Sequence, residues 1–135
     1  MAVPRLLLLS DLVSEFVEDT EAAQKALESG KPRGPVTGLS RLDETMGGFF
    51  SNGLHIIQAA PGAGKSAFSL QVSANCQFPA LYLTAEMSIL EIFRRLISRE
   101  TETYLGRLKT GELGVKEAMR LALETVKKLP AFALL

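Results

Sequence analysis

Residues 55–70, HIIQAAPGAGKSAFSL, constrain the fold more than any other part of this chain. They comprise a short apolar run, a Gly-rich turn that ends in Gly-Lys-Ser, and the beginning of a helical stretch. A strand, a turn and a helix in this order direct the N–H groups of the turn and the helix N-terminus toward one anion. The stretch therefore predicts an α/β protein with a phosphate-binding loop.

The side chains of the loop match this chemistry at every position but one. Ala59 stands where the usual G-x-x-x-x-G-K-[ST] pattern has its first Gly, and Ala is the smallest residue that can replace it. Gly62 and Gly64 can adopt backbone angles that are closed to other residues. Lys65 brings a positive charge to the β and γ phosphates, and Ser66 offers a hydroxyl oxygen to the accompanying Mg²⁺. The alternative is a chance match, in which Lys65 is a surface lysine at a helix start.

The rest of the chain alternates predicted strands with predicted helices. Apolar runs predict strands over 54–60 and 80–86, and the beginning of a third strand over 129–135. We expect helices over 66–77, from Ser88 onward and over 115–128, where Ser88 and Glu91 have the spacing of a capping box. Residues 106–114 are expected to form a turn-rich break. This alternation is typical of a parallel α/β sheet with right-handed crossovers.

The first 45 residues predict two helices and a linker. Apolar residues recur at helical spacing on a face whose opposite side is acidic: Leu9, Leu12, Val13, Phe16 and Val17. Ser10 can cap this helix and Gly30 can end it, and composition makes 30–35 a linker. Ser40 and Asp43 have capping-box spacing and predict a second, short helix.

Composition excludes several classes of protein. Fifteen basic residues balance fifteen acidic ones, so no global positive field gathers nucleic acid. The single cysteine, Cys76, cannot form an internal disulfide and is expected to be a small apolar residue on a helix. The apolar run at 6–9 is shorter than a secretory signal, and no segment has the roughly 20 apolar residues of a membrane span. We therefore expect a cytoplasmic chain without membrane contact.

Glu86 is the candidate catalytic carboxylate. It falls at the end of the second predicted strand, where open α/β sheets gather ligand-facing groups. A carboxylate there can orient or deprotonate a water that attacks the γ phosphate, or instead interact with the dipole of the next helix. His55 is expected to be structural. The charged residues of the helix after Ser88 are expected to form a solvated face: Glu91, Arg94, Arg95, Arg99 and Glu100.

Four blocks of the sequence together resemble one family. The blocks are TGLSRLDETMGG before the first predicted strand, QAAPGAGKSAFSLQVS around the loop, LYLTAEMS at the second strand, and RLKTGEL between two later helices. They span residues 36–135, and their order and spacing are similar to those of the C-terminal ATPase domain of DnaB-type replicative DNA helicases. In that family, a RecA-like motor of superfamily 4, Ala is common at the first Gly position of the loop.

The resemblance implies a fold, a reaction and site residues. The fold is a partial RecA-like P-loop NTPase core of parallel strands and flanking helices over 34–135, preceded by a linker helix and hinge over 1–33. The family couples ATP hydrolysis to translocation on single-stranded DNA, and Glu86 and Lys65 are the implied catalytic residues. Ser66 is the implied Mg²⁺ ligand. The implied ATP-binding residues are Ala60, Pro61, Gly62, Ala63, Gly64, Lys65 and Ser66.

The resemblance also leads to expectations about partners and activity. The N-terminal helix is expected to dock on a helicase subunit, in a homo- or hetero-oligomer. The family's Walker B Asp, DNA-binding loops and arginine finger would lie beyond Leu135, so we expect the isolated chain to bind nucleotide weakly and hydrolyse it poorly. Two alternatives remain: a non-enzymatic module that docks on a helicase ring or loader, and a truncated gene product without function.

Overall fold

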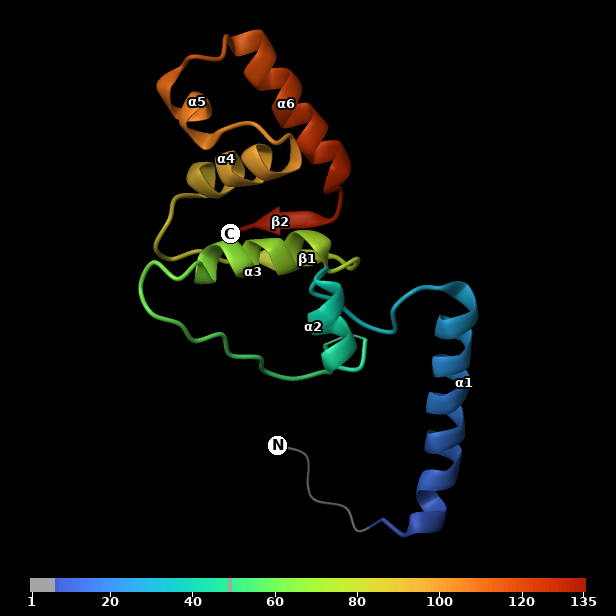
Figure 1. The fold of residues 1–135 in the computed structure, drawn as a ribbon. Helices are drawn as coiled ribbons and strands as arrows, with labels where there is room; N and C mark the ends of the chain where they lie inside the picture. The colour runs from blue at the N-terminus through green and yellow to red at the C-terminus, as the bar shows by residue number, and fades with distance from the viewer. Residues whose placement is uncertain (1–6, 49) are drawn as a thin grey trace.

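A computed structural model describes residues 7–48 and 50–135. The first element of the described residues is a short 3₁₀ helix, η1, and six α-helices and two strands follow it there (Figure 1). In order they are η1 (Leu9–Leu12), α1 (Val13–Ser29), α2 (Ser40–Thr45), α3 (Lys65–Asn75), β1 (Ala80–Tyr82), α4 (Ile89–Glu100), α5 (Leu105–Thr110), α6 (Val115–Lys128) and β2 (Phe132–Leu134). The protein is thus a mixed helix and strand fold with a small sheet.

The sheet is parallel, as the alternation of strands and helices predicts. β1 and β2 are hydrogen-bonded neighbours, and Ala80 pairs with Phe132 and Tyr82 with Leu134. Three helices, α4 to α6, connect the two strands, because a parallel pair needs a crossover. The predicted third strand at 129–135 is confirmed as β2, and the second is confirmed but shortened to Ala80–Tyr82.

The core lies where α3 and α4 meet this sheet. Leu70 of α3 and Ile92 and Leu96 of α4 are buried together. Aromatic and aliphatic side chains of the strands and adjoining segments pack against them: Ala74, Tyr82, Met87, Leu129, Phe132 and Leu134. The helix predicted after Ser88 buries Ile92, Leu96 and Ile97 but leaves Ile89 exposed. The Ser88 hydroxyl accepts a hydrogen bond from the Glu91 N–H at 3.2 Å, as a capping residue should.

One predicted strand is wrong. Residues 54–60 have no regular secondary structure and belong to no sheet, and they lie in the long loop between α2 and α3 (Figure 1). Leu54 is 87% exposed and Ile56 is 81% exposed. The apolar pattern of a buried strand is present, but a strand also needs a hydrogen-bonded neighbour, and the described residues place none beside this segment.

Two predicted helix starts are also wrong. α1 is preceded by η1, and the N–H of Leu8, the residue before η1, donates to the Asp11 carboxylate at 3.0 Å. The side chain that caps this helix start is therefore that of Asp11 and not that of Ser10. α2 has no side-chain cap from Ser40. Gly30 does end α1 as predicted, with a left-handed φ of 65°.

The predicted break at 106–114 contains a helix instead. α5 covers Leu105–Thr110, and only from Gly111, with φ 74°, does the chain turn as expected. Lys109 of α5 lies 2.8 Å from the Glu91 carboxylate of α4. Contact with α4 therefore stabilises a helix that local sequence alone does not indicate.

α1 lies apart from the sheet (Figure 1). It buries no residue, and its C-terminal end leads into a linker whose Arg33 pairs with Asp19 of the helix. Along the described part of the chain, no helix combines the length and the apolar character that crossing a membrane requires.

Candidate nucleotide-binding site

The loop at 60–66 is a tight turn that runs directly into α3. The Ala63 N–H donates to the Ala60 carbonyl at 3.2 Å and closes the turn. Gly62 and Gly64 have left-handed φ values of 77° and 94°, which an L side chain adopts only with strain. Apart from the two residues adjacent in the chain, no atom lies within 4 Å of the point where a Cβ would stand at either glycine, so the turn is open to a ligand.

The N-terminus of α3 faces the end of this turn. Gly64 precedes the helix, and its carbonyl accepts the first N–H of the helical series, from Phe68 at 2.9 Å. The N–H groups of the three residues before Phe68 have no acceptor within the helix, as at every helix start. Such groups, together with the positive end of the helix dipole, favour an anion at this position.

Lys65 lies over the entrance of the turn. Its Nζ donates to the Ala59 carbonyl at 2.9 Å and to the Ala60 carbonyl at 3.1 Å, and the residue is exposed. These contacts hold the ammonium group beside the turn. Ser66, the expected Mg²⁺ ligand, is half-buried in the first turn of α3. The structure thus brings Lys65 and Ser66 together with the turn.

Glu86 does not end a strand, which corrects the prediction. β1 ends at Tyr82, and Glu86 is exposed in a bend four residues later. The bend leaves the sheet at the end toward which the strands point, and α3 begins at the same end (Figure 1). Glu86 and the loop therefore share the C-terminal end of the sheet, where ligands of open α/β folds bind.

Thr84 fixes the bend that carries Glu86, and the sequence prediction missed it. The Thr84 hydroxyl donates to the Met87 carbonyl at 2.9 Å and accepts from the Met87 N–H at 3.2 Å. A threonine hydroxyl that bonds to nearby backbone in this way is a known turn-forming device. Thr84, which precedes Glu86 in the sequence, is the residue from which this bend could have been predicted.

Asp43 anchors the segment that precedes the loop. Its carboxylate accepts hydrogen bonds from the Thr37 N–H at 2.7 Å and the Gly38 N–H at 3.1 Å, so it reaches back beyond its own helix instead of forming a capping box with Ser40. Partial burial alone would raise the pKa of Asp43, but the hydrogen bonds from Thr37 and Gly38 outweigh it and lower the pKa. Thr37 is fully buried.

This anchored turn docks on the C-terminal end of α3. The Val36 N–H donates to the Cys76 carbonyl at 3.2 Å, and a Cβ at Gly38 would lie 2.5 Å from the Asn75 Cβ. Only glycine fits this approach at a φ of 75°. The block TGLSRLDETMGG thus holds the far end of the helix that begins at the candidate phosphate-binding loop.

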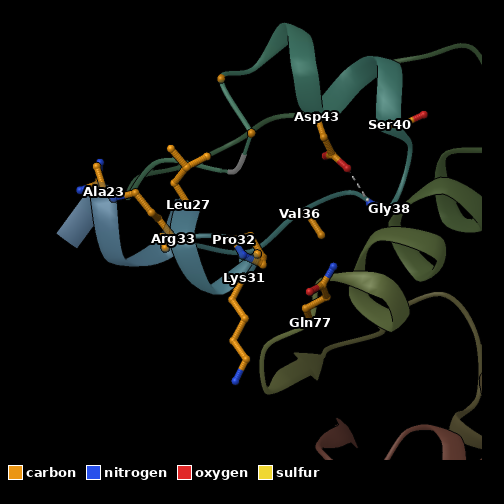
Figure 2. Close-up of a pocket in the computed structure, with 14 residues that line it drawn as sticks. Ala23, Leu27, Lys31, Pro32, Arg33, Val36, Gly38, Ser40, Asp43 and Gln77 are labelled. Atoms are coloured by element: carbon orange, nitrogen blue, oxygen red, sulfur yellow. Dashed lines mark hydrogen bonds between the residues drawn. The ribbon is translucent and has the colours of Figure 1, made fainter. Parts of the chain in front are cut away.

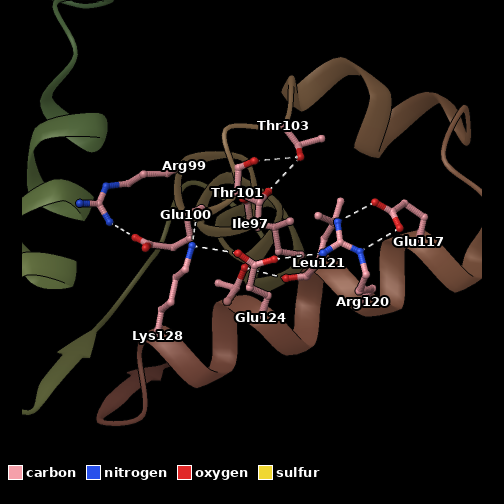
Figure 3. A network of polar contacts seen from close by, with 11 residues as sticks. Ile97, Arg99, Glu100, Thr101, Thr103, Glu117, Arg120, Leu121, Glu124 and Lys128 are labelled. Atoms are coloured by element: carbon pink, nitrogen blue, oxygen red, sulfur yellow. Dashed lines mark hydrogen bonds and ion pairs between the residues drawn. The ribbon is translucent and has the colours of Figure 1, made fainter.

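The charged residues of α4 are more than a solvated face. The Arg99 Nε donates to the Gln71 side chain of α3 at 2.8 Å, and Arg99 also pairs with Glu100 (Figure 3). Lys128 of α6 donates to the Glu100 carbonyl at 2.6 Å and lies 2.9 Å from Glu124. The prediction missed that these groups join α3, α4 and α6.

Glu91 joins α4 to α5. Lys109 and Arg95 lie 2.8 Å and 3.1 Å from its carboxylate. The hydrogen bond from Lys109, with a smaller contribution from Arg95, lowers the pKa of Glu91. These ion pairs lie within α4 and between α4 and α5. Neither of them involves residues 60–66 or Glu86.

Two other residues have structural contacts. A His55 ring nitrogen lies 2.9 Å from the Ser51 carbonyl, and the ring packs edge-on against Phe50. Cys76 is buried at the end of α3, and its Sγ contacts the Phe78 carbonyl at 3.1 Å.

A cavity of about 590 Å³ lies away from the loop, between the end of α1, the linker and α2 (Figure 2). Leu27, Pro32, Val36 and Gln77 are among its lining residues, and none of residues 60–66 lines it. This cavity is therefore separate from the candidate phosphate site.

Comparison with known proteins decides the family. Residues 34–134 match the model of the DnaB-like helicase C-terminal domain. The chain belongs to this family. The replicative DNA helicase DnaB of Treponema pallidum is 30% identical to the DnaB-like chain over 118 residues, and that of Nostoc is 28% identical over 127 residues. A probable replicative DNA helicase of Guillardia theta is 35% identical over 86 residues.

The DnaB-like chain spans only a small part of these relatives. The three alignments cover 84%, 90% and 61% of this chain, but 26%, 14% and 14% of the respective relatives. No solved structure matches the chain. The resemblance seen in four short blocks is thus confirmed at the level of the family.

Proposed function

We propose that this DnaB-like chain binds the phosphates of ATP with residues 60–66. The observation that carries the proposal is the start of α3 directly after two left-handed glycines, with Lys65 held at the entrance of the turn. Backbone N–H groups from Gly62 to Ser66 would face the β phosphate, and the Lys65 ammonium would leave the Ala59 and Ala60 carbonyls for the phosphate oxygens. Uncharged carbonyls hold an ammonium group less strongly than a phosphate does.

Ser66 would contribute one ligand to the Mg²⁺ that accompanies ATP. Within the described residues, no group of three or more His, Cys, Asp or Glu side chains gathers closely enough to hold a metal ion alone. A hydroxyl oxygen at the helix start, together with phosphate oxygens and waters, suits Mg²⁺, which keeps several waters in such sites. The ion would therefore bind with the nucleotide and not before it.

Glu86 would orient the water that attacks the γ phosphate. Its position at the same end of the sheet as the loop supports this role, and the Thr84 hydroxyl holds the bend that carries it. In this proposal residues 34–135 are the N-terminal half of a RecA-like ATPase domain, and residues 1–33 are the linker helix and hinge. ATP-driven unwinding of DNA is then the activity of the assembly to which the chain contributes.

Nucleotide titration of a Lys65→Ala variant tests the proposal. We expect the wild-type chain to bind a fluorescent ATP analogue with Mg²⁺, and the variant to bind at least about tenfold more weakly, because the charge that faces the phosphates is lost. Lys116→Ala, an exposed lysine at the start of α6, is the matched control and should bind as the wild type does. Equal affinity in all three chains would contradict the proposal.

We expect ATP hydrolysis by the isolated chain to be slow. Along the described residues, Lys65 is the cation that the structure shows in contact with the loop, and one cation neutralises little of the charge that develops in phosphoryl transfer. Robust turnover that Lys65→Ala abolishes would contradict this expectation.

We also propose that α1 docks on a helicase subunit. α1 buries no residue, and Phe16 is 71% exposed and Val13 59% exposed on its apolar face. A helix with such a face is stable mainly when a partner covers it. Copurification with a full-length replicative helicase should be lost in a Leu12→Ser/Phe16→Ser variant, and binding unchanged by both substitutions would rule out α1 as the contact.

A further inference from the structure

Two hydrogen bonds in series join the first turn of α3 to β1. The Ser69 hydroxyl donates to the Ser66 carbonyl at 3.1 Å, and the same oxygen lies 3.1 Å from the Tyr82 hydroxyl. A serine hydroxyl has one proton to donate. Because that proton is directed to the Ser66 carbonyl, the Tyr82 O–H is the donor of the second bond. The two bonds therefore run in one direction, from Tyr82 through Ser69 to Ser66.

The sheet and the core hold the Tyr82 ring in place. Tyr82 is the last residue of β1 and pairs with Leu134 of β2. Its ring stacks on that of Phe132, with the two ring centroids 6.4 Å apart, and packs against the buried core between α3 and α4. The Tyr82 hydroxyl is thus the end of an anchored side chain, which can restrain Ser69.

Ser66 is the residue of the candidate site that this restraint reaches. Its carbonyl accepts the bond from Ser69, and its own hydroxyl is the proposed Mg²⁺ ligand. Mg²⁺ requires nearly ideal octahedral geometry, with ligand oxygens at about 2.0–2.1 Å. A small displacement of the Ser66 hydroxyl should therefore weaken metal ligation more than it weakens the contacts of phosphate with backbone N–H groups.

We propose that Tyr82 is a positioning residue of the candidate nucleotide site, which holds the Ser66 hydroxyl in place for Mg²⁺ by way of Ser69. The effect on ATP rests on the proposed function of residues 60–66, whereas the restraint on α3 exists without nucleotide. Loss of the Tyr82 hydroxyl should therefore loosen the first turn of α3 in the free chain and weaken ATP binding only when Mg²⁺ is present.

Amide hydrogen exchange of the nucleotide-free 135-residue chain, measured by NMR, tests the restraint by itself. Tyr82→Phe keeps the ring and removes only the hydroxyl. The Phe68 N–H, which donates to the Gly64 carbonyl at 2.9 Å, should exchange about threefold to tenfold faster, because the first turn of α3 loses a hydrogen bond to the sheet. Tyr104→Phe, at a tyrosine that is 76% exposed, is the matched control and should leave this rate unchanged. Unchanged exchange in Tyr82→Phe would overturn the proposal whether or not the chain binds ATP.

Titration with a fluorescent ATP analogue tests the effect on the site. With Mg²⁺, Tyr82→Phe and Ser69→Ala should each bind about threefold to tenfold more weakly than the wild type. In EDTA, both should bind as the wild type does. Ser69→Thr keeps a hydroxyl that can bond to the preceding turn, so it should retain the affinity of the wild type with Mg²⁺. Equal losses with and without Mg²⁺ in Tyr82→Phe would overturn the proposal, since a merely destabilised turn weakens binding in both conditions.

Lys65→Ala separates a failure of this proposal from a failure of the proposed function. It should weaken binding both with Mg²⁺ and in EDTA, because its charge faces the phosphates in either case. A wild-type chain that binds no nucleotide, or a Lys65→Ala chain that binds as the wild type does, would contradict the proposed function and with it the role of Tyr82 at the site. Weak binding by Lys65→Ala, together with full Mg²⁺-dependent affinity in Tyr82→Phe, would overturn the role of Tyr82 alone.

Discussion

At the scale of single residues, backbone geometry and short polar contacts define the candidate site. Gly62 and Gly64 adopt the left-handed conformations that the loop pattern requires, and Ala59 takes the place of the missing Gly, its carbonyl bonded to Lys65. Contacts that span several residues were less predictable. Asp43 accepts hydrogen bonds from the N–H groups of Thr37 and Gly38, which precede its helix, and the capping-box spacing did not indicate these partners.

Asp43 leads to a prediction about stability and pH. Its pKa is lowered in the folded chain, so its carboxylate contributes stability above the pKa of the unfolded chain, and this contribution is lost as the pH falls through the folded value. Asp43→Asn should therefore lower the melting temperature at neutral pH and reduce the loss of stability below about pH 4. Thermal melts between pH 3 and 7 measure both effects. Glu44→Gln, on the exposed side of the same helix, is the control, and an equal effect there would contradict the role of Asp43.

At the scale of elements, the periodicity of apolar residues predicted the long helices of the chain. The elements that depend on tertiary contacts were not predicted from it. The helices from Ser88 onward and over 115–128 appear where apolar residues recur at helical spacing. α5 was missed because its helix depends on contact with α4, for example through Lys109 and Glu91. The strand at 54–60 was predicted wrongly because a strand depends on a neighbour that local sequence does not reveal.

α4 gives the clearest prediction at this scale. Ile92 is fully buried in the core, whereas Ile89, three residues earlier, is 52% exposed. Ile92→Ala should lower the free energy of unfolding by about 2–5 kcal/mol, because it leaves a cavity among Leu70 and Leu96. Ile89→Ala should cost less than about 1 kcal/mol. Urea denaturation measures both free energies of unfolding. A similar loss in the two variants would contradict the burial of Ile92 in the core.

At the scale of the whole molecule, the chain combines a candidate phosphate-binding loop with apolar side chains that are exposed in the described structure. Apolar side chains of α1 and of the segment at 54–60 are exposed, among them Phe16 at 71%, Leu54 at 87% and Ile56 at 81%. The resemblance identified the family from four blocks, but it did not indicate which of these side chains the chain leaves exposed. Those exposures follow from the packing of the sheet and could not be read from the residues.

The central claim is that the loop at 60–66 binds ATP, and amide NMR spectra of the ¹⁵N-labelled chain test it most directly. Titration with ATP and Mg²⁺ should shift the amide signals of Gly62 to Ser66 first and most, with smaller changes near Glu86. In Lys65→Ala the same shifts should require at least about tenfold more ATP. Signals at 60–66 that stay unchanged at saturating nucleotide, or shifts confined to the cavity beside α1 and α2, would contradict the claim.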